Sequence, residues 1–223
     1  MYIKSIRIFG PALVAMLAMS VVAVSAASAA KPEFKPASGK FTSKSGTSIL
    51  SVPAVKNVVT CKKDTNKGEI TSPTSVGHVV VTFTECEAKI GTTAKACTVK
   101  SKSPKGVADN EIITNTLKGD LGTSKEATDG VALVLEPASG KVFVELESEC
   151  LTVSPAKVEG MVAGEVTPTE KSQKTGKLIY ELTGTEQKIK KVNGVTAKLD
   201  VDTLEATEES LDEIGYEKAT EVT

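Results

Sequence analysis

Cysteine is the residue type in this chain whose number and spacing point most directly to chemistry. The four cysteines are Cys61, Cys86, Cys97 and Cys150, and none of them forms the close C-x-x-C pair that zinc sites and redox motifs use. An even number of widely spaced cysteines is typical of structural disulfides in exported proteins. We therefore expect two disulfide bonds, no metal site and no cofactor.

Spacing leaves the connectivity of these disulfides open, because four cysteines allow three pairings. We prefer Cys61 with Cys86 and Cys97 with Cys150. The runs NVVTC and HVVVTFTEC both end at a cysteine, and a shared sheet would bring those two ends within bridging distance. The rival pairing joins Cys86 with Cys97 around the loop EAKIGTTAKA and leaves Cys61 with Cys150.

Catalytic motifs are incomplete. His78 is the only histidine, no G-x-S-x-G motif accompanies it, and we expect it at a strand end. Ser154 and Lys157 fit the S-x-x-K motif of penicillin-recognising enzymes, and Lys174 begins a K-T-G motif. The S-D-N motif is missing, and Pro155 disfavours the helix on which the serine and lysine would have to meet. We expect no catalytic residues and no enzyme activity.

Acidic residues offer a remaining route to catalysis or metal binding. Glu145, Glu147 and Glu149 alternate along one predicted strand, and a second acid across the sheet would complete the carboxylate pair of a glycoside hydrolase. A solvated strand face is the more common explanation of this spacing. Asp200 and Asp202 lack the D-x-[DN]-x-[DN]-G frame of a calcium loop, so we expect no calcium site there.

The first thirty residues predict the compartment. Lys4 and Arg7 precede an apolar run over 11–24, which is shorter than the ~20 residues of a membrane span. The small residues of 25–30 then fit a signal-peptidase site. We expect residues 1–29 to be a cleaved signal peptide, and the rest to be secreted to the extracellular space or the cell envelope without a transmembrane segment.

Composition argues against nucleic acid as a partner. The chain has 27 basic and 28 acidic residues, and its only arginine, Arg7, lies in the predicted signal peptide. Arginine is the side chain best suited to bidentate contacts with phosphate and guanine. The partner is unknown from sequence, and an extracellular protein or polymer fits the predicted location.

Short β-branched runs separated by turn residues predict the fold class. We expect an all-β fold, a single sandwich or barrel of about 8–10 short antiparallel strands. The clearest hairpin is VALVLE, the turn PASG and KVFVELE over 131–147. Both faces of VALVLE are apolar, which indicates a central strand.

Composition also divides the chain into segments. Residues 30–46 are rich in Lys, Pro, Ser and Gly and are predicted to be a flexible linker, residues 47–203 a β domain, and residues 204–223 an acidic C-terminal segment. A short C-terminal helix is a further expectation, with Thr203 as its N-cap and Gly215 as its end.

Several segments together resemble a group of small exported β-rich proteins that recur in some actinobacterial genomes. They are TCKKDTNKGEI, VVVTFTEC, EIITNTLKGDLG, LEPASGKVFVELESEC and VEGMVAGEVTP, within about residues 47–204. These motifs are turns and cysteines, so the resemblance implies a β-rich extracellular domain and carries over no site residue. The expected function is a non-enzymatic surface contact or binding module, and the alternative is an extracellular polymer hydrolase with paired carboxylates.

Overall fold

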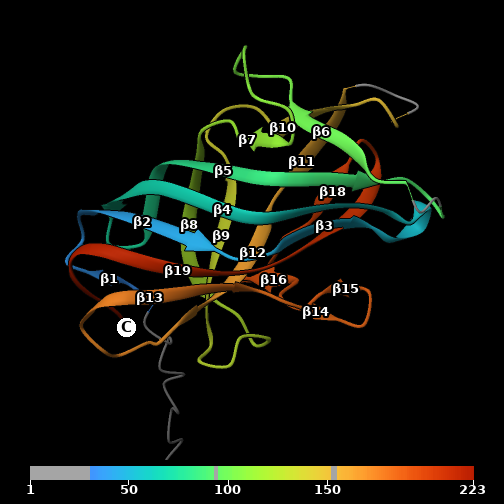
Figure 1. Ribbon diagram of the computed structural model, residues 1–223. Helices are drawn as coiled ribbons and strands as arrows, with labels where there is room; N and C mark the ends of the chain where they lie inside the picture. The colour runs from blue at the N-terminus through green and yellow to red at the C-terminus, as the bar shows by residue number, and fades with distance from the viewer. Residues whose placement is uncertain (1–30, 93–94, 152–154) are drawn as a thin grey trace, which may run out of the picture. The chain divides into compact units, whose positions relative to one another are not determined.

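The structure is a computed structural model that describes residues 31–92, 95–151 and 155–223 (Figure 1). The regular structure of these residues is β-strand, apart from one 3-10 turn, η1 (Pro53–Val55), and every strand pairing is antiparallel. This confirms the predicted all-β fold. The predicted signal peptide, residues 1–29, lies outside the described residues.

Three long strands organise the fold and appear in Figure 1 as the ribbons that cross the domain. They are β4 (Asn57–Ser72), β5 (Ser75–Lys89) and β19 (Leu204–Val222). The first part of β4 pairs with β3 (Ser48–Val52) and the second part with β2 (Gly39–Ser45), and β19 pairs with the same two strands. The long strands therefore take part in two closed circuits of strands.

The first circuit, which we call ring 1, follows the order β2, β4, β5, β8, β9, β12, β13 and β19 and closes from β19 to β2. Its other strands are β8 (Leu117–Thr123), β9 (Val131–Pro137), β12 (Val162–Thr167) and β13 (Gln173–Tyr180). A closed ring has no strand edge open to pairing with another chain.

The second circuit, ring 2, follows the order β3, β4, β5, β6, β10, β11, β18 and β19 and closes from β19 to β3. Its other strands are β6 (Cys97–Ser101), β10 (Val142–Ser148), β11 (Ala156–Gly160) and β18 (Leu199–Val201). The two rings thus share β4, β5 and β19, which pass from one to the other.

Short strands complete the domain. The strand β7 (Glu111–Ile113) pairs with β5 between the part of β5 that meets β8 and the part that meets β6. The strand β1 (Phe34–Lys35) pairs with the end of β19. Two small hairpins lie between β13 and β18, and they consist of β14 (Leu182–Thr183) with β15 (Glu186–Gln187), and β16 (Lys191–Val192) with β17 (Val195–Thr196).

The alternation of inward-facing and outward-facing side chains along β5 is interrupted at two places. Residue 76 is buried, then residues 79 and 81, then residues 86 and 88. The breaks fall at His78 and Glu85, whose φ angles are 54° and 55°. A left-handed residue within a strand bends it and shifts its facing pattern. The second break lies where β5 passes from ring 1 to ring 2.

The core fills the interior of both rings with Val, Leu, Ile and aromatic side chains. Within β9, Val131, Leu133 and Leu135 face this core, while Ala132 packs on the outer side against Ile189 and neighbouring side chains. β9 lies between β8 and β12. The predicted central strand is therefore confirmed.

The predicted hairpin of β9 with β10 is wrong. A turn joins the two strands in sequence, but β9 pairs with β8 and β12, whereas β10 pairs with β6 and β11. The turn carries the chain from ring 1 to ring 2, so the strands separate after it. Apolar alternation and a turn motif specify two strands, and they do not specify that these strands pair.

The predicted flexible linker also needs correction, because residues 34–45 contribute β1 and β2. Phe34 is 4% exposed and belongs to the core. β2 lies between β19 and β4 in ring 1. The sequence of β2, GKFTSKS, reads as a linker because two of its inward-facing residues, Ser43 and Ser45, are polar.

The expected C-terminal helix is wrong as well, since residues 204–222 form β19. The apolar side chains of this segment do not share one face, because Leu211 is 43% exposed and Ile214 is buried. Every second residue from Ala206 to Tyr216 turns inward instead. Two of these inward residues are acidic, Glu208 and Asp212, and their charge conceals the strand pattern in the sequence.

Candidate functional site

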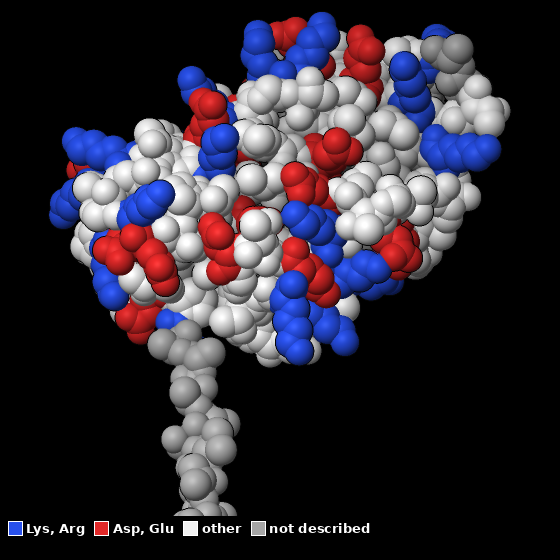
Figure 2. Space-filling model, turned by 90° about the horizontal axis from the view of Figure 1, so that it is seen from below, with Lys and Arg blue, Asp and Glu red and all other residues white. Residues whose placement is uncertain are grey.

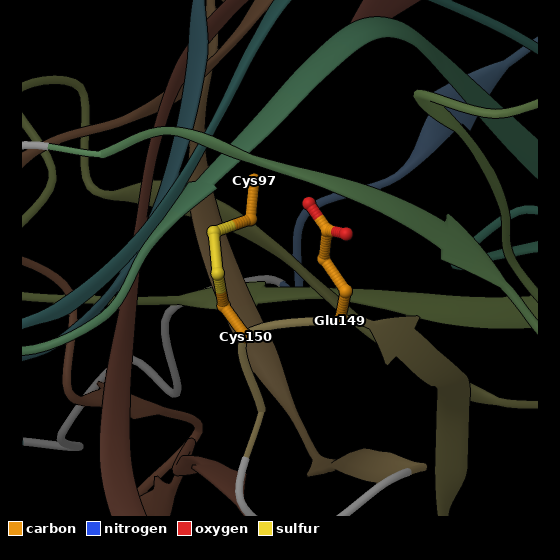
Figure 3. Close-up of side chains that lie close together, drawn as sticks. All are labelled: Cys97, Glu149 and Cys150. Carbon is orange, nitrogen blue, oxygen red and sulfur yellow. A yellow bond between two sulfur atoms is a disulfide. The ribbon is translucent and has the colours of Figure 1, made fainter.

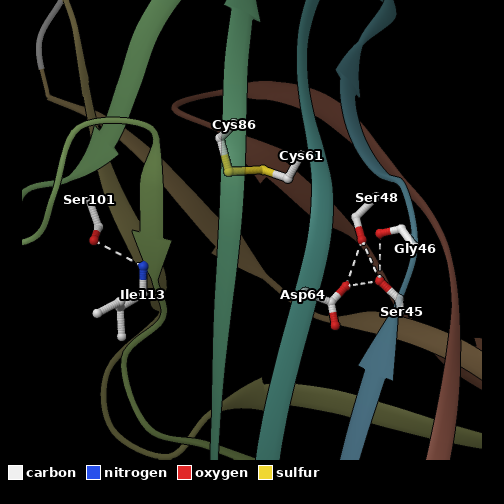
Figure 4. Close-up of a disulfide and its surroundings, with 8 residues drawn as sticks. All are labelled: Ser45, Gly46, Ser48, Cys61, Asp64, Cys86, Ser101 and Ile113. Carbon is white, nitrogen blue, oxygen red and sulfur yellow. Dashed lines mark hydrogen bonds between the residues drawn. A yellow bond between two sulfur atoms is a disulfide. The ribbon is translucent and has the colours of Figure 1, made fainter.

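Both disulfides follow the preferred pairing. Cys61 of β4 and Cys86 of β5 are register partners with Cα atoms 3.9 Å apart, and Figure 4 shows the bond between these neighbouring strands. Cys97, at the start of β6, is bonded to Cys150, which follows β10, with a Cα separation of 6.1 Å. The prediction is confirmed and the rival pairing is wrong. These cysteines join strands that already lie close together, which is a structural role.

One group of possible metal ligands converges within the described part of the chain. The ligand atoms of Cys97, Glu149 and Cys150 lie within 4.8 Å of one another (Figure 3). Both sulfur atoms belong to the disulfide bond, whereas zinc and other soft metals bind the thiolate form of cysteine. With the disulfide formed, this group offers one exposed carboxylate.

On the strands that flank β10, lysines and not acids lie opposite Glu145 and Glu147. The carboxylate of Glu145 lies 3.1 Å from the Nζ atom of Lys102, and Lys100 is the register partner of Glu147. Lysines oppose these glutamates on neighbouring strands. This arrangement is that of a solvated strand face.

The other sequence candidates are dispersed. His78 lies near the start of β5 with its Nδ1 atom 3.5 Å from the carboxylate of Glu69, and both side chains are largely exposed. Ser154 lies outside the described residues, while Lys157 is in strand β11 and Lys174 is in strand β13. Both lysines are exposed. Of the two acids that lack a calcium-loop frame, Asp200 pairs with Lys198, and Asp202 accepts a hydrogen bond from the backbone N–H of Lys157.

A cavity of about 110 Å³ lies inside the domain where the two rings meet. Leu117 and Leu135 line it from ring 1, and Leu50 and Leu146 line it from ring 2. All of its described lining residues are buried or half-buried. The cavity is therefore formed by side chains of the domain interior, and most of its surface is apolar.

Backbone irregularity contributes to the apolar lining. The pairing of β10 with β11 shifts register between Val142 and Val144, and both Phe143 and Val144 are buried and line the cavity. Successive residues of a regular strand face opposite sides, so the β-bulge is what turns two neighbours inward.

One side of the cavity region is polar, and we call it the polar wall. It consists of inward-facing residues from β2, β3, β4 and β19. Ser48, Asp64, Asn66, Glu208, Ser210 and Asp212 line the cavity, and Ser43 and Ser45 lie beside them on β2. Ser45 is the register partner of both Asp64 and Asp212, so the two aspartates stand on either side of β2. Their exposed fractions are 3% and 6%.

Hydrogen bonds hold one oxygen of Asp64 in place. The Oγ atom of Ser48 donates to Asp64 Oδ2 at 2.6 Å, and the Oγ atom of Ser45 donates to the same oxygen (Figure 4). The figure also shows the second oxygen of Asp64 directed away from both serines. The serines thus orient the carboxylate and leave one of its oxygens available.

Four buried oxygens of the polar wall have no hydrogen-bond partner among the protein atoms. They are Ser43 Oγ, Asp64 Oδ1, Asn66 Oδ1 and Asp212 Oδ1. Buried polar atoms are nearly always paired, and an unpaired one costs about 1–3 kcal/mol. Among the described residues that line the cavity, none carries a positive charge. The wall therefore combines acid groups with unsatisfied acceptors.

Burial and mutual repulsion raise the pKa values of these acids. Burial, followed by the negative charge of Asp64 and a hydrogen bond between the two carboxyl groups, raises the pKa of Asp212 to about 8. Burial, followed by the charges of Asp212 and Asp64, raises the pKa of Glu208 well above its usual value. The same causes raise the pKa of the Tyr180 hydroxyl. With a pKa of about 8, Asp212 is thus mainly protonated at neutral pH.

Sequence reasoning missed the polar wall. Asp64 and Asp212 are far apart in the chain, and no motif links them. The available signal was the alternation in β19, where Glu208 and Asp212 fall on the same parity as the apolar Ala206 and Ile214. This parity places the two acids on the core face once the segment is recognised as a strand.

Charged side chains are mixed on the outer surface. Figure 2 shows lysines interspersed with acidic residues over the face that it presents. Several form ion pairs, such as Lys63 with Glu85 at 2.7 Å and Lys188 with Glu181 at 2.8 Å. The described residues include no helix that is long and apolar enough to cross a membrane.

Comparisons of this chain with protein-family models, with curated proteins and with solved structures find no match. The resemblance to small exported actinobacterial proteins stays a prediction. The cavity and its polar wall are therefore the features of this domain that bear on its function.

Proposed function

We propose that this chain is an exported, non-enzymatic β domain that acts as a binding module, with the internal cavity as its binding site. The observation that carries the proposal is the cavity of about 110 Å³ between the rings. An empty apolar cavity of that volume destabilises a fold by about 2–3 kcal/mol. A small molecule that fills it would recover this energy, and apolar cavities of similar size do bind small molecules.

Export is supported by the signal-peptide pattern of residues 1–29 and by the two disulfides, which are typical of oxidising compartments. The alternative of a polymer hydrolase requires a cleft that admits a sugar or peptide chain between two carboxyl groups. The acids of the polar wall line a cavity of only about 110 Å³ instead, which offers little room for a polymer chain beside them. We expect no turnover of polysaccharide, peptide or ester substrates.

The test of the binding proposal uses small apolar probes on the folded, oxidised protein. Xenon or benzene should shift the backbone amide NMR signals of cavity-lining strands such as β8 and β10 and raise the melting temperature. The variant Val158→Leu, which adds volume beside the cavity, should weaken this response, and the matched variant Val195→Leu on the exposed β17 should not. Absence of any response at saturating probe would exclude the cavity as a binding site.

A further inference from the structure

We infer that the ligand of the cavity is a small primary ammonium compound with a short apolar chain. The ammonium group would bind the polar wall at Asp64 and Asp212, and the chain would fill the apolar part of the cavity. The inference rests on the proposed binding function and specifies the chemical class of the ligand.

The acids on one side of the cavity indicate that the ligand carries a positive charge. Asp64 and Asp212 are at least nine-tenths buried, and each has one carboxyl oxygen whose only protein partner is the proton that the two acids share when Asp212 is protonated. Both residues line the cavity, and no described lysine lines it with them. A primary ammonium group donates three hydrogen bonds and carries the missing positive charge. It therefore supplies both the hydrogen-bond donors and the positive charge that the polar wall lacks.

The apolar lining of the cavity indicates that the ligand also carries a short hydrocarbon chain. Phe83, Leu135, Phe143 and Leu146 also line the cavity, and their side chains are apolar. A cavity of about 150 Å³ accommodates benzene, so one of about 110 Å³ suits a chain of about four carbons. A fully polar ligand would leave these side chains without contacts.

A hard metal ion fits this geometry less well. Calcium requires about six to eight oxygen ligands arranged around one point. The three acids Asp64, Glu208 and Asp212 do not converge within 4.8 Å, since the trio of Cys97, Glu149 and Cys150 is the one group of the described residues that does so. A metal ion would also leave the apolar part of the cavity unfilled.

Binding should be coupled to the release of a proton. The ionisable groups that face Asp212 are Asp64 from β4, Glu208 from β19 and Tyr180 from β13, and all of them are acids. An ammonium group between the aspartates favours the ionised form of Asp212, so the proton held there in the free protein passes to the buffer. Calorimetry in two buffers with different ionisation enthalpies measures this transfer.

The experiment is isothermal titration calorimetry of the full folded domain at pH 7.5 with n-butylamine, 1-butanol, butyrate and calcium chloride. We expect n-butylamine to bind at least tenfold more tightly than 1-butanol and to release protons. Asp212→Asn should reduce n-butylamine affinity at least tenfold and abolish the proton release. Glu213→Gln, which changes an acid on the outer face of the same strand, should bind like the unmodified protein.

The outcomes separate this inference from the proposed function. If 1-butanol or butyrate binds as tightly as n-butylamine, the cavity binds ligands and the ammonium inference is wrong. Calcium binding that depends on Asp212, without amine binding, also overturns it. If no organic probe binds while circular dichroism shows a folded protein, the ammonium inference and the binding function fall together.

Discussion

At the scale of single residues, the most informative group is Asp212, a carboxyl placed where its charged form is least stable. It is 6% exposed, Asp64 lies nearby, and no described cation lines the cavity with it. Retaining such a group in a core costs stability unless it is protonated or paired. At neutral pH Asp212 is mainly protonated, and a cation bound under the proposed function would pair with its charged form instead.

The raised pKa of Asp212 gives a pH dependence with a definite sign. Between its ordinary value of 3.8 and its folded value of about 8, the folded state binds more protons than the unfolded state. The contribution of Asp212 to stability is thus greatest at low pH and is lost as pH rises toward 8. We expect Asp212→Asn to raise the melting temperature at pH 8 by several degrees and to change it little at pH 5.

Thermal unfolding between pH 5 and 9 measures this effect, with Glu213→Gln as the control that should follow the unmodified protein. Exposed pairs act in the opposite direction at the acid end, because Lys63 and Lys62 lower the pKa of Glu85, and Lys190 lowers that of Glu186. These pairs lose stability as pH falls below about 4. If the melting temperatures of Asp212→Asn and the unmodified protein change with pH in parallel, Asp212 does not cause the pH dependence of stability.

At the scale of elements, the passage of the chain between rings depends on special backbone positions. Gly160 ends β11 just before β12 begins in ring 1, and its φ angle is 106°. A Cβ atom placed there would lie 2.2 Å from the carbonyl oxygen of Lys198. Gly140, in the turn between β9 and β10, also has a positive φ of 72°, but open space surrounds its Cβ position.

These two glycines provide a matched test of that passage. We expect Gly140→Ala to cost about 1–2 kcal/mol of unfolding free energy, which is the backbone strain alone. Gly160→Ala should cost at least about 3 kcal/mol, because the β11–β18 pairing must also open to admit the methyl group. Urea denaturation measures both losses of unfolding free energy. Equal losses would show that the close approach of Gly160 to the Lys198 carbonyl oxygen does not add to the cost of the substitution.

The elements also show how far the sequence can be interpreted. β9 was predictable because both of its faces are apolar, and the disulfide of Cys61 with Cys86 was predictable because both cysteines end valine-rich runs. β2 and β19 were missed because Ser43, Ser45, Glu208 and Asp212 occupy their inward positions. Local rules fail where a site places polar groups in the core. Two strands that escaped prediction, β2 and β19, therefore contribute much of the polar wall, together with β3 and β4.

At the scale of the whole domain, the shared strands link the stability of the two rings. β4, β5 and β19 each contribute hydrogen bonds to both circuits, and the hydrophobic core is continuous between them. Neither ring can open fully without breaking strands of the other. We therefore expect the domain to unfold in a single cooperative transition, although it contains two closed rings.

The disulfide of Cys97 with Cys150 tests this coupling, because it lies in ring 2 alone and closes a segment of 53 residues. Replacing both cysteines by alanine should lower the unfolding free energy by about 4 kcal/mol on the chain-entropy relation. Hydrogen exchange of the folded protein should show this loss equally at amides of β9 in ring 1 and β11 in ring 2. Replacing Cys61 and Cys86, whose separation is 25 residues, should give a similar uniform loss of about 3.5 kcal/mol. If the amides of β11 lose protection while those of β9 keep theirs, the rings unfold independently, and the shared strands do not transmit stability between them.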